Sequence, residues 1–107
     1  MTNELTMRER AAKAAGLTVD PNTKHTEKWT VRNQRGDLFD WAPWADDGDA
    51  LRLGAAIAMQ LQIRKQVGVD AGEAAVTAGS NHAVEAYTGD CMPAVRLAIL
   101  RAAAACA

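Results

Sequence analysis

The sequence predicts an α+β fold in which an antiparallel β-sheet of about four to five strands is layered with helices. Segments of alternating apolar and polar residues recur, and short turns containing Gly and Asn separate them. Other stretches place apolar residues at helical spacing, so the expected order is α-β-β-α-β-β-β-α. The chain has 107 residues, which is enough for one compact domain over residues 1–107 and too few for two ordinary ones.

The first helix is expected over residues 4–15. Asn3 or Thr6 can cap its N-terminus, and Glu9 would complete a capping box with Thr6. Gly16 suits the left-handed backbone conformation that commonly follows a helix. The residues expected to face the core are Met7, Ala11, Ala14 and Ala15.

The second helix is expected to begin at Asp46-Asp47-Gly48-Asp49, which supplies a cap and negative charge for the positive end of the helix dipole. Gly54 lies inside this helix, where it should allow close backbone packing against the sheet. The expected apolar stripe consists of Ala50, Leu53, Ile57 and Leu61.

The last helix is expected to be capped by Gly89-Asp90, with Pro93 in its first turn, where a missing N–H has little effect. Its predicted buried face consists of Val95, Ala98, Ile99, Ala102 and Cys106.

A first hairpin is expected from residues 27–33 and 37–41, joined by the turn Asn33-Gln34-Arg35-Gly36. Its register would bring apolar side chains together on one face. These are Trp29, Val31, Phe39 and Trp41. The preceding residues 18–26 are polar and carry the turn signal Pro21-Asn22.

Strand spacing returns after Met59, where residues 61–67 alternate between apolar and polar side chains. Residues 73–78 and 82–88 are expected to form a second hairpin around Ala78-Gly79-Ser80-Asn81.

Composition and charge exclude several classes of protein. Twelve Lys and Arg oppose 13 Asp and Glu, so the net charge is -1 and the pI is about 6.1, which argues against a dedicated nucleic-acid binder. No stretch reaches the ~18 uncharged apolar residues of a membrane span. Charged residues occupy the N-terminus, where a signal peptide would be apolar, so we expect no membrane association and a cytoplasmic location.

No residue pattern indicates a metal, a cofactor or a catalytic site. The soft ligands His25, His82, Cys91 and Cys106 fall in no metal-binding spacing, and Asp46–Asp49 reads as a helix cap better than as a calcium loop. The sharpest catalytic alternative is Cys91 at a helix N-terminus with His82 as its base. Asp90 beside Cys91 would favour the thiol, so we expect no catalytic residue.

The tryptophans are the most distinctive feature. Trp29, Trp41 and Trp44 can form either an exposed binding surface or, in a domain with few large apolar residues, part of the core. Arg32 and Arg35 give the first hairpin a positive face. The candidate binding residues are therefore Trp29, Arg32, Arg35, Trp41 and Trp44.

The segment from Trp41 to Leu53, WAPWADDGDALRL, resembles the most recognisable block of the phage ABA-sandwich family. The start Arg10-Ala-Ala-Lys-Ala-Ala-Gly16 and the end of the chain, with Arg96, Ile99 and Arg101, are similar more loosely, whereas residues 60–88 are not. The resemblance implies an antiparallel sheet layered with helices and a bacteriophage origin. It implies no activity and no functional residues.

From these observations we expect a non-enzymatic phage accessory protein that binds a bacterial host protein, such as a component of a defence system. The alternative is a binder of a nucleotide-type signal, for which Arg32, Arg35 and Trp44 are the candidate residues. Association with nucleic acid is a weaker alternative, and homo-oligomerisation stays open. The host cytoplasm is the expected location.

Overall fold

The computed structural model describes residues 4–24, 26–66 and 68–106, and within them it contains three α-helices and two antiparallel sheets. The helices are α1 (Glu4–Ala14), α2 (Asp47–Ala56) and α3 (Met92–Ala105). One sheet, the N-terminal sheet, consists of β1 (Thr18–Val19), β2 (Trp29–Arg32) and β3 (Leu38–Trp41). The other, the C-terminal sheet, consists of β4 (Gln60–Lys65), β5 (Ala71–Ala78) and β6 (Asn81–Thr88). A 3₁₀ turn, η1 (Pro21–Thr23), follows β1.

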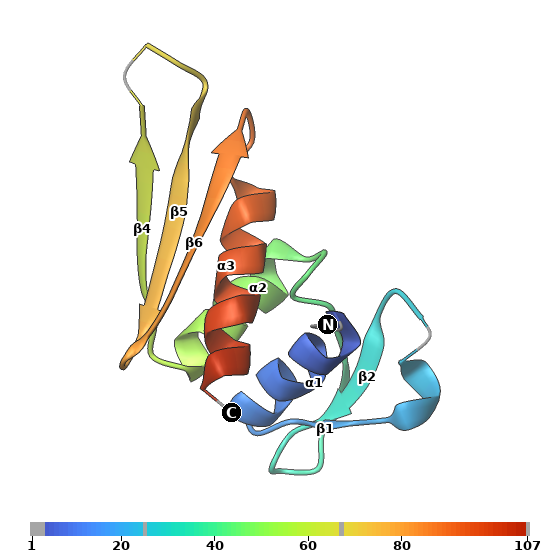
Figure 1. Cartoon of the computed structure of the whole chain (residues 1–107). Helices are drawn as coiled ribbons and strands as arrows, with labels where there is room; N and C mark the ends of the chain where they lie inside the picture. The colour runs from blue at the N-terminus through green and yellow to red at the C-terminus, as the bar shows by residue number, and fades with distance from the viewer. Residues whose placement is uncertain (1–3, 25, 67, 107) are drawn as a thin grey trace.

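The α+β class and the antiparallel pairing are confirmed, but the single sheet of four to five strands is wrong. The helices lie between the two sheets, as Figure 1 shows, and the molecule extends 47 × 28 × 28 Å. Within each sheet, every strand pairs with the strands next to it in the sequence, and α2 connects β3 of one sheet to β4 of the other. Because the helices fill the space between the strand sets, each sheet buries one face on them instead of joining the other sheet.

The N-terminal sheet follows the predicted hairpin register and contains one more strand than the sequence predicts. Trp29 pairs with Trp41 and Val31 with Phe39, and Gly36 in the turn has φ +88°. The additional strand β1 pairs Val19 with Val31. This strand has only two residues, so it is too short to show the alternation of apolar and polar side chains by which a strand is predicted from sequence.

The first two helices end as their local signals predict, with two corrections. Gly16 has φ +75° after α1, and Asp46 caps α2 by accepting a hydrogen bond from the Asp49 N–H at 2.9 Å. Thr6 lies inside α1 and is not its cap, and Asn3 lies outside the described residues. Gly54 does allow a close approach, but to the side chain of Met59 and not to the sheet.

The helix α3 is the centre of the core. It packs against α1 and α2 on one side and against β5 and β6 on the other. Its N-cap is Cys91, while Asp90 accepts a hydrogen bond from the Met92 N–H at 3.0 Å. Cys106 is exposed, contrary to prediction, because it lies at the C-cap of α3, beyond the buried part of the helix, where its Sγ accepts a hydrogen bond from Nδ2 of Asn81 at 3.5 Å. The buried residues of α3 are Ala94, Val95, Ala98, Ile99, Leu100, Ala102, Ala103 and Ala104.

Candidate functional site

The three tryptophans form one interlocked cluster. The ring centroids of Trp29 and Trp44 lie 5.0 Å apart, those of Trp41 and Trp44 lie 5.6 Å apart, and both pairs are edge-to-face. Trp29 and Trp41 are buried, because β2 and β3 turn both indoles toward the helices. The cluster therefore stabilises the core through aromatic packing, and two of its three indoles have no surface to offer a partner.

Trp44 is half-buried, and its polar and π groups already have partners within the chain. Its Nε1 donates to the Glu27 carbonyl at 3.0 Å, and the Arg8 guanidinium lies 3.9 Å from the centre of its ring. Its own carbonyl accepts a hydrogen bond from Nε of Arg96. A base or an aromatic side chain that stacked on this indole would have to displace Arg8.

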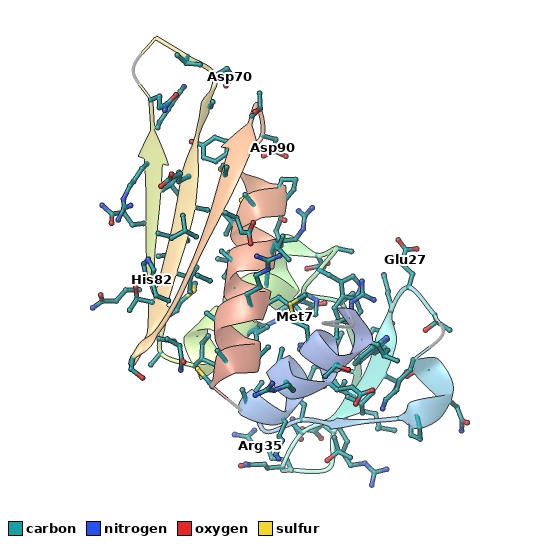
Figure 2. The ribbon with its side chains drawn as sticks, in the orientation of Figure 1. Met7, Glu27, Arg35, Asp70, His82 and Asp90 are labelled. Carbon is teal, nitrogen blue, oxygen red and sulfur yellow. The ribbon has the colours of Figure 1, made fainter. Side chains whose placement is uncertain are left out.

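Arg32 and Arg35 lie apart from the indoles. The register places Arg32 on the same face as Thr30 and Leu38, opposite to the face that carries Trp29 and Trp41. Arg35 belongs to the turn at the far end of the hairpin and is labelled in Figure 2. The nucleotide-binding alternative requires the two arginines and Trp44 to contact one ligand. The geometry does not bring these three side chains together.

The geometry also separates Cys91 from His82. His82 lies at the beginning of β6, where its Nδ1 is 2.8 Å from Oγ1 of Thr77. Cys91 follows the end of that strand. Figure 2 labels Asp90, the residue before Cys91, and shows that it lies far from His82 along the C-terminal sheet. A strand of this length spans roughly 20 Å, so the imidazole cannot take a proton from this thiol.

The aspartates at the start of α2 are used within the fold. Asp46 caps the helix, and Asp49 accepts from the Ala42 N–H at 3.0 Å and pairs with Arg52 at 2.5 Å. Across residues 4–24, 26–66 and 68–106, no three His, Cys, Asp or Glu side chains are grouped so that they could hold a metal ion. His25 lies outside these residues. No helix of the described chain is long and apolar enough to cross a bilayer.

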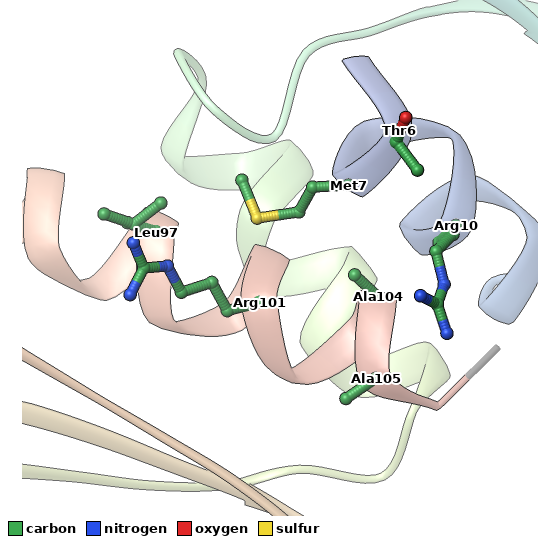
Figure 3. A pocket seen from close by; sticks show the side chains of 7 residues that line it. All are labelled: Thr6, Met7, Arg10, Leu97, Arg101, Ala104 and Ala105. Carbon is green, nitrogen blue, oxygen red and sulfur yellow. The ribbon is translucent and has the colours of Figure 1, made fainter. Parts of the chain in front are cut away.

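A hollow of about 690 Å³ lies between α1 and α3 (Figure 3). Its floor is apolar, and Arg10 on α1 and Arg101 on α3 flank Ala104 in this view. The remaining lining residues are Thr6, Met7, Leu97 and Ala105. Both arginines interrupt the apolar pattern of their helices, so the sequence predicts only that their side chains face solvent. No local sequence pattern indicates that the two residues line the same hollow.

The charged side chains that line this hollow are arginines. Among its described lining residues two are arginines and none carries a carboxylate. Arg101 pairs with Glu85 of β6 at 2.5 Å, and this ion pair fixes the guanidinium at the rim while leaving more than half of the side chain exposed. An apolar surface bordered by two guanidinium groups can hold an apolar side chain and bind carboxylates beside it.

No family model, curated protein or solved structure matches the chain.

Proposed function

We propose that this chain is a bacteriophage accessory protein that acts by binding a protein of its bacterial host, and that the hollow between α1 and α3 is the binding surface. The proposed partner is a component of a bacterial defence system whose contact segment presents carboxylates beside an apolar side chain. The phage setting comes from the resemblance of residues 41–53. The observation that supports this binding surface is that Arg10 and Arg101 both border an apolar floor, with no carboxylate among the described lining residues.

One further feature favours binding over catalysis by Cys91, because His82 and Cys91 are too far apart to cooperate. The tryptophan cluster is occupied by internal packing, so we place the binding surface at the hollow and not at the tryptophans. The hollow is open to solvent, so an extended contact segment fits it better than an enclosed small molecule does.

The test is a binding measurement on purified components. The tagged chain first recovers its partner from a lysate of the host, and the affinity of that partner is then measured for two double variants. Arg10→Ala/Arg101→Ala removes both guanidinium groups from the hollow, whereas the matched control Arg32→Ala/Arg35→Ala removes two from the first hairpin. We expect at least a tenfold loss of affinity, about 1.4 kcal/mol, for the first variant only.

Each other result contradicts part of the proposal. A loss confined to Arg32→Ala/Arg35→Ala would move the surface to the N-terminal sheet, and equal affinities would exclude the hollow. Calorimetric binding of a nucleotide by the isolated chain, with no protein partner recovered, would favour the ligand-binding alternative.

The role in defence needs a separate test in cells. Expressing the chain should restore plaque formation by a phage that the defence system blocks, and an unchanged number of plaques would contradict that role.

A further inference from the structure

The strand β4 is an exposed edge of the C-terminal sheet. The sheet order is β4-β5-β6, so within the described chain β4 has a neighbour on one side only (Figure 1). All six of its residues are exposed. An edge strand of this length presents a row of backbone donors and acceptors to which another strand can pair.

The hydrogen bonds on the paired side show which backbone groups remain on the open side. The Gln66 N–H donates to the carbonyl of Ala71, its direct partner in the register, at 3.0 Å. Hydrogen-bonded pairs alternate along an antiparallel ladder, so Gln60, Gln62 and Arg64 also bond to β5. The N–H and C=O groups on the open side are therefore those of Leu61, Ile63 and Lys65.

The side chains of the same residues extend the apolar inner face of the sheet beyond the helix that covers it. Leu61 lies opposite Val76 and Ile63 opposite Ala74, and both partners are fully buried under α3. Ile63 itself is 46% exposed, because α3 covers β5 and β6 but not β4. A neighbouring strand would continue the sheet and bury both apolar side chains.

We infer that two copies of this chain pair through β4, antiparallel and about a two-fold axis at Ile63, to form one continuous six-stranded sheet. In this register Ile63 lies opposite Ile63 of the partner subunit, and Leu61 lies opposite Lys65 of the partner subunit. All three open N–H groups of each copy gain an acceptor, because residues with the same outward orientation face one another across the axis.

The charges of β4 fit a second copy in this register. The strand carries Arg64 and Lys65 and no carboxylate, so many alignments of two such strands would bring like charges together. With the axis at Ile63, Arg64 lies opposite Gln62 of the partner subunit, whose amide oxygen can accept from the guanidinium. The same two side chains already bond within one strand, with Nη2 of Arg64 donating to Gln62 at 3.1 Å.

The other edge of the sheet does not offer the same surface. Glu85 lies in the middle of β6 on the inner face and is held by Arg101. A charge pointing inward from an edge strand discourages pairing, because a second strand would bury it. The β4 edge has no such charge at its centre, where Ile63 lies.

An interface made of one strand per subunit buries less than the ~800 Å² per partner of a standard interface, so the dimer should be weak and concentration-dependent.

The first measurement is amide hydrogen exchange on the unmodified chain at about 10 μM and about 1 mM, a concentration range that spans the dissociation constant of a weak dimer. We expect the amides of Leu61, Ile63 and Lys65 to become at least several-fold better protected at the higher concentration. The amides of Gln62 and Arg64 should be protected at both, because β5 accepts from them.

The second measurement is sedimentation of two variants across the same range. Ile63→Lys places two ammonium groups against each other on the axis and should give a monomer at every concentration. Val84→Lys is the matched control, because Val84 is 40% exposed on the outer face of the opposite edge, and it should dimerise like the unmodified chain.

Several results would overturn this inference. A monomer at every concentration for the unmodified chain would do so, as would protection of Leu61, Ile63 and Lys65 that does not change with concentration. A folded Ile63→Lys variant that still dimerises, or a Val84→Lys variant that no longer dimerises, would exclude the pairing of two β4 strands as the interface. The exchange measurement needs no substitution, so it decides the question even if Ile63→Lys does not fold.

Discussion

Ala58 adopts a backbone conformation that favours glycine. Its φ is +54° just after α2, where the Met59 N–H closes the helix by donating to the carbonyl of Gly54 at 3.0 Å. An L side chain in this region brings Cβ close to the following carbonyl oxygen. We therefore expect Ala58→Gly to raise the free energy of unfolding by about 1 kcal/mol, measured by urea denaturation.

The control for this substitution lies in the helix itself. Ala55 is exposed within α2 and has ordinary helical geometry, so Ala55→Gly should lower the free energy of unfolding by roughly 0.5–1 kcal/mol. The two substitutions make the same chemical change and should have opposite signs. Equal destabilisation by both would mean that the left-handed geometry at Ala58 causes no strain.

Arg96 links α3 to the start of α2. Its Nη1 pairs with Asp47 at 2.5 Å, its Nε donates to the Trp44 carbonyl, and the side chain is only 20% exposed. Arg52 also pairs with an aspartate at 2.5 Å, but within α2 and with 74% of its side chain exposed. We expect Arg96→Ala to destabilise the fold by about 1–3 kcal/mol and Arg52→Ala by less than about 0.5 kcal/mol.

Thermal and urea unfolding of both variants measure this difference. Arg96→Lys adds a further distinction, because a single ammonium group cannot make both contacts in the same geometry and should restore less than half of the loss. Similar small losses for Arg96→Ala and Arg52→Ala would show that the contact between α3 and α2 depends on apolar packing alone.

The elements that sequence predicts well are those whose signals are local. A capping aspartate, a turn glycine and two alternating strands act within a few residues, so the cap at Asp46, the turn at Gly36 and the register of Trp29 with Trp41 could be predicted. The number of sheets depends on where α3 packs, which no local pattern contains. The hollow has the same origin, because Arg10 and Arg101 come from opposite ends of the chain and line one hollow only because α1 packs against α3.

At the scale of the whole molecule, α3 joins two sheets that share no strand pairing. Its alanines make this arrangement compact, since Ala98 and Ala102 are buried with only a methyl group each between the layers. If α3 leaves its position, the C-terminal sheet loses the helix that covers it, and α1 and α2 lose the helix against which they pack. The two sheets should therefore unfold together and not as separate units.

The aromatic residues provide a separate probe for each sheet. All three tryptophans belong to the cluster on the N-terminal sheet, whereas Tyr87, the only tyrosine, lies on β6 against Gly72. We expect the midpoint of urea unfolding from tryptophan fluorescence to equal that from ¹⁹F NMR of 3-fluorotyrosine at position 87. Ala98→Leu, which overfills the space around α3, should lower both midpoints by the same amount, corresponding to about 1–3 kcal/mol. If the tyrosine signal changed first and the tryptophan signal later, the C-terminal sheet would be a separate folding unit, and α3 would remain with the tryptophan cluster after that sheet had detached.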